Sequence, residues 1–218
     1  MRFQNLARAL QGACEIRMLQ PPEASIVART VDLAALYANV IMAQPPATCF
    51  IAGFSVGGLA ALETARLVVQ RGGAVPALFL LDTLYPSRLW GGTALWRALR
   101  WAVGALRLQD LSMNGRRLGA MLNDAGLFGQ VMAVSGYRVG AYPGAMHLVK
   151  SVGLAGRWNR LLFSGWRLRR VGRLVEHQVS GMHGSMFEPP HVHELAECLR
   201  AVVQATPAAT ESPGFNPP

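Results

Sequence analysis

The chain has few cysteines and no long apolar stretch, and each shortage excludes a class of protein. Cys14, Cys49 and Cys198 are its three cysteines, and their wide spacing fits reduced thiols better than a disulfide framework or a metal site. No apolar run approaches the ~18 residues of a membrane span, and the N-terminal segment lacks the apolar core of a signal peptide. We therefore expect a cytoplasmic protein without a membrane span.

Charged residues are also scarce, at 15% of the chain, whereas hydrophobic residues make up 51%. In 218 residues this composition indicates one ordered domain with a substantial core. The net charge of +9 comes almost entirely from arginine, because Lys150 is the only lysine. Three interpretations are open: an ordinary solvated surface, a surface for an acidic or phosphate-bearing partner, and a nucleic-acid surface. No nucleic-acid-binding motif accompanies the charge, so we expect no nucleic-acid partner.

The strongest local signal is a Gly-x-Ser-x-Gly motif between a strand pattern and a helix pattern. The apolar run 49–52 precedes GFSVGG (residues 53–58), and a helical repeat follows as far as residue 71. This arrangement is typical of a nucleophile elbow, in which a strand turns sharply into a helix. Backbone presses on backbone there, so residues without Cβ are expected on both sides of the turn. We expect Ser55 at the apex in a strained conformation; a plain strand-to-helix turn is the alternative.

Alternating helix and strand patterns predict an α/β fold with a mostly parallel sheet and flanking helices. Helices are expected at residues 3–10, 25–42, 59–71 and 192–204, and strands at 15–19, 49–52, 75–81, 146–151 and 174–179. Two further helical stretches within residues 85–133 predict a lid inserted at the active-site edge, with a membrane-surface helix as the alternative. The Pro-, Thr- and Ala-rich residues 206–218 are expected to be a disordered tail, which leaves 1–205 as the domain.

An acidic side chain and an imidazole follow two of the predicted strands. Asp82 comes directly after a continuous apolar strand, and His183 lies in a glycine-flanked loop just past the last strand. Groups beyond the carboxyl ends of parallel strands meet at one edge of the sheet. We therefore expect Ser55, Asp82 and His183 to converge there, with His183 as the base and Asp82 as its orienting acid. The Val56 N–H is expected to donate to the oxyanion. A strand-end turn or a helix cap is the alternative for Asp82.

The other histidines have less suitable positions. His147 lies within a strand pattern, and His177 lies on the polar side of the last strand. His191 and His193 precede or open the final helix, so we expect surface or capping roles for them. A His-x-His pair can bind a metal ion, but no third ligand stands at a useful spacing, and no metal site is expected.

A family resemblance is carried most clearly by three segments of the chain. They are GFSVGGLAALETARLVVQRG (residues 53–72), ALFLLDTLYPS (77–87) and VSGMHGSMFEPPHVHELAECLRAVV (179–203). Together they resemble the thioesterase domains that end nonribosomal peptide and polyketide synthetases. The resemblance covers most of the chain and is weakest in the expected lid.

This resemblance implies an α/β-hydrolase fold with a catalytic triad of Ser55, Asp82 and His183. It implies transfer of an acyl group from a carrier-bound phosphopantetheine thioester to Ser55, followed by release to water or to an internal nucleophile. An acidic acyl or peptidyl carrier protein would be the partner of the basic surface. No metal or redox cofactor is implied.

One departure from the family pattern concerns the start of the chain. Family members begin with an apolar strand and a His-Pro-Gly-Gly-like loop that supplies a second oxyanion donor, whereas this chain starts at Met1-Arg2-Phe3 in the following helix. We therefore expect the first core strand to be missing and activity to be impaired, because losing one such donor costs on the order of 10²–10³ in rate. A general carboxylesterase or lipase with the same triad and a non-catalytic interaction module stay open as alternatives.

Overall fold

The computed structural model describes residues 3–20, 30–43, 48–86, 137–152, 163, 165–167 and 173–206. The chain forms two compact units. The first comprises Met1–Leu19, Ala34–Tyr85 and Gly140–Pro218, and the second comprises Gln20–Leu33 and Pro86–Val139. All strands of the sheet and the three expected site residues belong to the first unit. Nearly all of the expected lid and all of the expected tail beyond residue 206 lie outside the described residues, so the predicted domain organisation stays a prediction.

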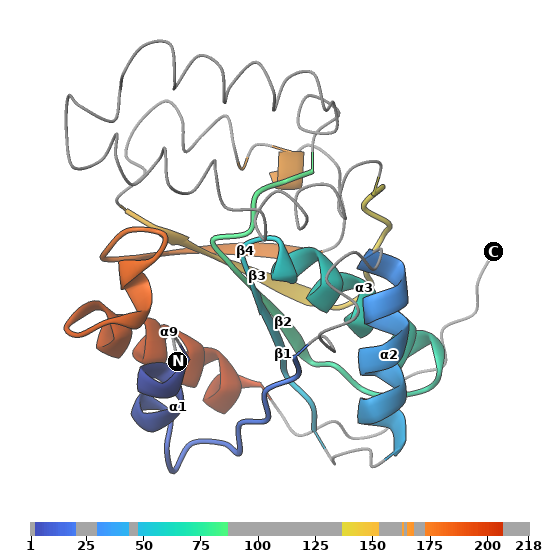
Figure 1. Cartoon of the computed structure of the whole chain (residues 1–218), viewed down its shortest axis with the longest axis horizontal. Helices are drawn as coiled ribbons and strands as arrows, with labels where there is room; N and C mark the ends of the chain where they lie inside the picture. The colour runs from blue at the N-terminus through green and yellow to red at the C-terminus, as the bar shows by residue number, and fades with distance from the viewer. Residues whose placement is uncertain are drawn as a thin grey trace. The chain divides into compact units, whose positions relative to one another are not determined.

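Four parallel strands form the sheet of the first unit (Figure 1). They are β1 (Ile51–Phe54), β2 (Ala77–Leu81), β3 (Ala145–Ser151) and β4 (Arg173–Val179), and in the described part of the chain they lie in this spatial order. All five residues of β2 are buried, as its continuous apolar run predicted for a strand covered on both faces. The α/β architecture with a parallel sheet is therefore confirmed.

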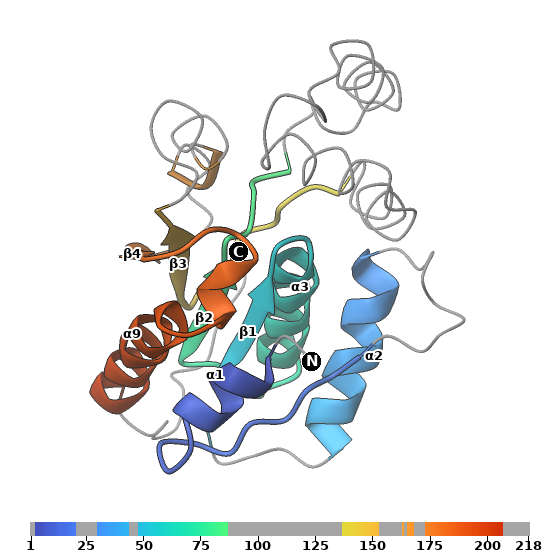
Figure 2. The same cartoon turned by 60° about the vertical axis from the view of Figure 1, so that its left-hand side comes forward.

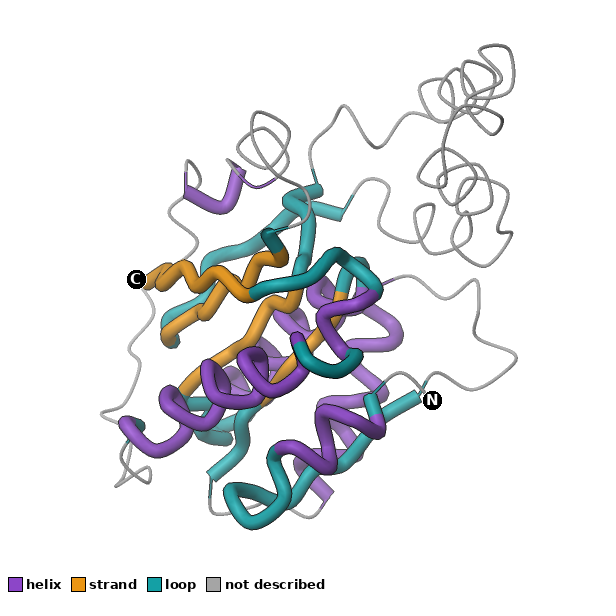
Figure 3. Tube along the Cα trace, turned by 90° about the vertical axis from the view of Figure 1, so that its left-hand side faces the viewer, coloured by secondary structure: helices purple, strands orange, loops and turns teal. Residues whose placement is uncertain are grey.

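Helices cover both faces of this sheet. The α3 helix (Gly57–Gln70) packs against β1 and β2 on one face, whereas α1 (Gln4–Ala9) and α9 (His191–Ala205) lie together on the other (Figure 2). Figure 3 looks onto this second helix layer, with the strands behind it. Side chains alternate along a strand, so Phe79 and Leu81 of β2 join Leu6 and Leu195 in the core beneath α1 and α9. Among the described helices, including α2 (Thr30–Ala43), none is long and apolar enough to cross a membrane.

The strand expected at residues 15–19 is wrong. These residues have no regular structure, and the side chains of Ile16, Met18 and Leu19 are 39–47% exposed. Alternating apolar residues allow a strand, but a strand also needs a neighbour that satisfies its backbone groups. In the part of the chain that the structure describes, β1 pairs with β2 alone, so the segment has no ladder to join.

Candidate active site

The turn between β1 and α3 consists of Ser55 and Val56, since β1 ends at Phe54 and α3 begins at Gly57. Ser55 has a φ of +55°, a left-handed conformation that residues other than glycine rarely adopt. Its N–H donates to the Leu81 carbonyl at 2.9 Å, which ties the turn to the end of β2. The strained backbone expected at this serine is confirmed, and it places Val56 directly before the first turn of α3.

Two glycines allow the close approach of strand, turn and helix. A Cβ built on Gly53 would lie 2.6 Å from Gly58 Cα and 2.7 Å from Ala61 Cβ, and one built on Gly58 would lie 2.6 Å from Thr83 Cγ2. A Cβ on Gly57 would have no atom within 4 Å. Close packing on both sides of the turn was therefore a correct expectation for Gly53 and a wrong one for Gly57. Successive helix residues point about 100° apart, so Gly58 faces the neighbouring strand end and Gly57 faces outward.

Asp82 follows the last residue of β2 and also has a positive φ, of +47°. Its N–H donates to the Val149 carbonyl at 2.8 Å, and its side chain is fully buried. Oδ1 accepts a hydrogen bond of 2.8 Å from the Ser151 N–H, and Oδ2 accepts one of 2.6 Å from the Ser151 hydroxyl. Residues 83–86 are irregular, so within the described chain Asp82 caps no helix and the capping alternative is wrong.

His183 connects Ser55, at the end of β1, with Asp82, at the end of β2. It lies in the loop between β4 and the short 3-10 helix η2 (Ser185–Phe187). Its Nδ1 lies 3.0 Å from Asp82 Oδ2, and its Nε2 lies 3.1 Å from Ser55 Oγ. An ionised carboxylate only accepts hydrogen bonds, so Nδ1 carries the ring proton and Nε2 accepts from the Ser55 hydroxyl. The side chains of Asp82, His183 and Ser55 thus form one hydrogen-bonded chain.

An aromatic cluster supports the imidazole. The His183 ring lies 4.5 Å from the Phe54 ring, centroid to centroid, with an interplanar angle of 30°. Phe54 makes an edge contact with Phe187 at 4.8 Å, and Phe3 makes another with Phe187 at 5.0 Å. The His183 ring thus lies against Phe54, and Phe54 is held in turn by Phe3, next to α1, and by Phe187 of η2.

The backbone of the His183 loop is anchored to the start of α9. The Ser180 N–H donates to Glu194 Oε2 at 2.9 Å. Hydrogen bonds from the side chain and backbone of Ser180 lower the pKa of the Glu194 carboxyl. His191 Nδ1 lies 2.9 Å from Ser180 Oγ, and the Met182 N–H donates to Ser185 Oγ at 2.9 Å. His191, expected to be a surface or capping residue, therefore also holds the loop that carries His183.

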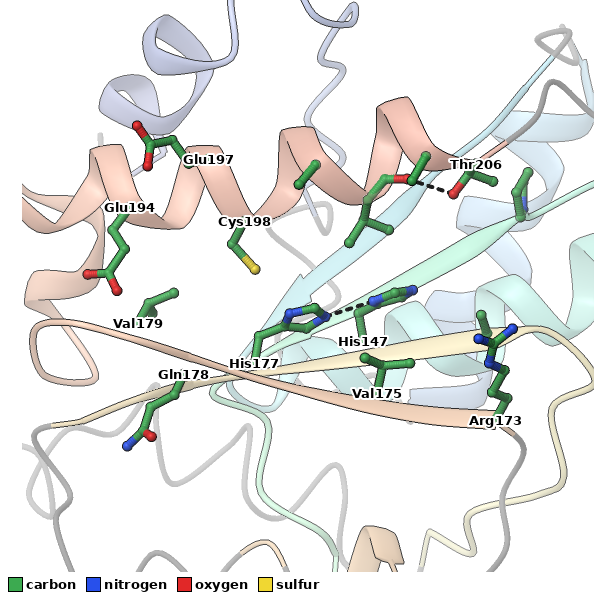
Figure 4. Close-up of a pocket in the computed structure, with 15 residues that line it drawn as sticks. His147, Arg173, Val175, His177, Gln178, Val179, Glu194, Glu197, Cys198 and Thr206 are labelled. Carbon is green, nitrogen blue, oxygen red and sulfur yellow. Dashed lines mark hydrogen bonds between the residues drawn. The ribbon is translucent and has the colours of Figure 1, made fainter.

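A second group of titratable side chains lines a pocket of about 720 Å³ between β3, β4 and α9 (Figure 4). His147 Nδ1 lies 2.9 Å from His177 Nε2 there, with Arg173 nearby on β4 and Glu194, Glu197 and Cys198 on the α9 side. Burial lowers the pKa of His147 to about 4, with His177 and Arg173 adding to the effect, and burial lowers that of His177. Within the described residues no group of three or more His, Cys, Asp or Glu side chains could hold a metal ion.

Because of this histidine pair, we expect the free energy of unfolding to fall on acidification. Burial lowers the pKa of His147 from its ordinary value of 6.5 to about 4 in the folded protein, so between these two pH values the unfolded chain binds more protons than the folded one. The free energy of unfolding is therefore highest above about pH 6.5. It falls as the pH drops toward about 4, by on the order of 1–2 kcal/mol after allowance for solvent screening. Urea unfolding at about pH 7 and pH 4.5 measures this loss.

The matched variants are His147→Gln, which should flatten the pH dependence, and His193→Gln at an exposed position of α9, which should leave it unchanged. Equal pH dependence in the two variants would contradict the assignment to this pair.

A parallel sheet covered by helices on both faces, with a strained serine between a strand and a helix, defines an α/β-hydrolase fold. The family model described as "Thioesterase domain" matches residues 1–109, half of the 218 residues, and the chain therefore belongs to this family.

Curated and solved relatives agree with this membership. The chain is 26% identical over 180 residues to vanchrobactin synthetase VabF of Vibrio anguillarum, a match that covers 76% of this chain and 6% of that synthetase. It thus spans about 6% of the length of this relative. The Vlm2 thioesterase domain matches with a TM-score of 0.65 and 23% identity, over 92% of this chain and 86% of that one.

A NocB thioesterase domain in covalent complex with a fluorophosphonate nocardicin G analog matches with a TM-score of 0.62 and 22% identity, over 93% of this chain and 88% of that one. At these identities the solved structures show the fold alone. The α/β-hydrolase fold and the resemblance to synthetase thioesterase domains, both expected from the sequence, are confirmed.

Proposed function

We propose that this chain is a serine thioesterase that releases an acyl or peptidyl group from the phosphopantetheine thioester of a carrier protein. The observation that carries the proposal is the hydrogen-bonded chain of Asp82, His183 and Ser55 at the carboxyl edge of a thioesterase-family sheet. A hydroxyl bonded to an imidazole that is bonded in turn to a buried carboxylate is the arrangement that activates a serine nucleophile.

In the proposed reaction Ser55 Oγ attacks the thioester carbonyl carbon while His183 Nε2 takes the hydroxyl proton. The carbonyl oxygen becomes an oxyanion next to the N-terminus of α3, where the Val56 N–H donates to it. Collapse of this intermediate breaks the carbon–sulfur bond, and the leaving pantetheine thiol receives the proton from His183. Asp82 orients the ring throughout and stabilises its protonated form.

The second half of the reaction releases the acyl group from Ser55. His183 removes a proton from water, or from a nucleophile within the acyl chain, and the resulting attack breaks the ester to Ser55. The hydroxyl regains its proton from His183, and the product is an acid or a cyclised chain. No step of this scheme uses a metal or redox cofactor.

An acidic carrier protein is the partner we propose for this basic chain. The net charge of this chain is +9, and opposite charges on two proteins speed their encounter, most strongly at low salt. The relative VabF is itself a synthetase, which supports a substrate of this kind. The rate with an acyl carrier protein should therefore fall as salt is added, whereas the rate with the free acyl-pantetheine thioester should change little.

A general carboxylesterase would use the same three side chains. We expect the thioester of a given acyl chain with pantetheine to react with a kcat/KM about tenfold or more above that of the p-nitrophenyl ester of the same chain. Using one acyl chain on both leaving groups separates recognition of the thioester arm from recognition of the acyl group. A clear preference for the ester would favour the carboxylesterase.

A further inference from the structure

We infer that Ser151 is a positioning residue, which holds both carboxylate oxygens of Asp82 and so aims Oδ2 at His183. The inference rests on the function proposed above for Asp82, His183 and Ser55. Ser151 makes no contact with a reacting atom in this scheme, and it acts through Asp82 alone.

The sheet register brings the two residues together. Leu81 of β2 is paired with Val149 of β3, so Ser151 lies two residues beyond the paired position, at the last residue of β3. Asp82 extends past β2 and donates its N–H to the Val149 carbonyl at 2.8 Å. Residues 149 and 151 point to the same face of a strand, and the Ser151 hydroxyl meets the Asp82 carboxylate there.

Ser151 donates two hydrogen bonds to the Asp82 carboxylate. Its N–H donates to Oδ1 at 2.8 Å, and its hydroxyl donates to Oδ2 at 2.6 Å. Both side chains are fully buried, so no solvent competes for these bonds. Hydrogen bonds from neutral groups to an ionised carboxylate are short and strong, and here two of them come from a single residue.

These two hydrogen bonds to Asp82 have a consequence for His183. The torsion between Cβ and Cγ of an aspartate is broad, so a carboxylate held by one bond can rotate. Bonds from one residue to both oxygens fix the carboxylate plane, and Oδ2 then faces His183 Nδ1 at 3.0 Å. A fixed acceptor at Nδ1 keeps the proton on that nitrogen and leaves Nε2 free to accept from Ser55.

The test compares three variants in the thioesterase assay. Ser151→Ala removes the hydroxyl donor and keeps the N–H donor, so kcat should fall about tenfold with KM unchanged. Ser151→Thr keeps the hydroxyl and should restore kcat to within about threefold. Thr64→Ala removes a hydroxyl that is similarly buried, at 2% exposure, but donates at 2.7 Å to the Ala60 carbonyl within α3. It should lower stability and leave kcat unchanged.

A double-mutant cycle separates positioning from a general effect on the fold. In an Asp82→Ala background, Ser151→Ala should cost nothing further, because the carboxylate through which it acts is gone. The same loss with and without Asp82 would overturn the inference, as would a loss of kcat in Thr64→Ala equal to that in Ser151→Ala.

A spectroscopic readout keeps the inference independent of the reaction. The ¹⁵N shifts of the His183 ring report which nitrogen carries the proton. We expect a strong preference for Nδ1–H in the wild type and a weakened preference in Ser151→Ala. If the wild type hydrolyses no thioester, the proposed function fails while these shifts still decide the role of Ser151. An unchanged preference in Ser151→Ala would overturn it.

Discussion

Replacing Ser55 by alanine is expected to abolish both thioester hydrolysis and covalent labelling by a fluorophosphonate probe. The Ser55 hydroxyl is the atom 3.1 Å from His183 Nε2, and alanine leaves the imidazole with nothing to activate. Removing the nucleophile of a serine hydrolase costs on the order of 10⁶ in kcat. Alanine meets the φ of +55° with the same Cβ as serine, so the fold should be retained. The thioesterase rate and the intact mass after labelling measure the two effects.

A second variant shows that the label is specific. Cys14→Ala removes the exposed thiol of the described chain and should be labelled as fast as the wild type. Hydrolysis or labelling that survives in Ser55→Ala would contradict the assignment of this residue. A wild type that takes up no label would support the non-catalytic interaction module instead.

Substituting alanine for Gly58 is expected to destabilise the protein severely, whereas the same change at Gly57 is expected to be harmless. A Cβ at position 58 would overlap the side chain of Thr83, which is fully buried. Thr83 cannot easily move, because its carbonyl accepts a hydrogen bond of 2.8 Å from the buried Trp166 indole. We expect a cost of about 3 kcal/mol, at the upper end of the range for overpacking, because the added atom meets a side chain that cannot easily move.

At Gly57 the added methyl group meets open space, and alanine is favoured over glycine in a helix by up to about 1 kcal/mol. Urea unfolding and the yield of soluble protein compare the two variants, which differ by one position in the same turn. Equal stability of Gly58→Ala and Gly57→Ala would show that the packing described at this elbow is incorrect.

Patterns within a short stretch of sequence were enough to predict most of the elements. The continuous apolar run before Asp82 predicted a strand buried on both faces, and β2 is buried along its whole length. The motif around Ser55 predicted the turn and its backbone strain. Alternation of strands and helices predicted that Ser55, Asp82 and His183 would meet at one edge, and their side chains lie within hydrogen-bonding distance.

Features that depend on register or on a partner were missed. The apolar alternation at residues 15–19 satisfies the strand pattern, but strand formation is decided by a neighbour that the pattern does not contain. Ser151 reads as an ordinary strand end, and it reaches Asp82 only because β2 and β3 pair in one register. The His147–His177 pair depends likewise on the pairing of β3 with β4. One local signal was available in the sequence: Phe54, an aromatic residue next to Ser55, supports the His183 ring.

Under the proposed function, the cluster of Phe3, Phe54, Phe187 and His183 also has a consequence for when during synthesis Ser55 becomes reactive. Ser55 and His183 are separated by 128 positions, and the Phe54 ring against which the imidazole lies is itself in contact with Phe3 and Phe187. A nascent chain that ends just after β1 and its turn contains the Ser55 hydroxyl but not yet the His183 imidazole, which would accept the proton. In the proposed reaction Ser55 therefore stays inert toward thioesters on the ribosome until residue 183 has been synthesised and its loop has folded.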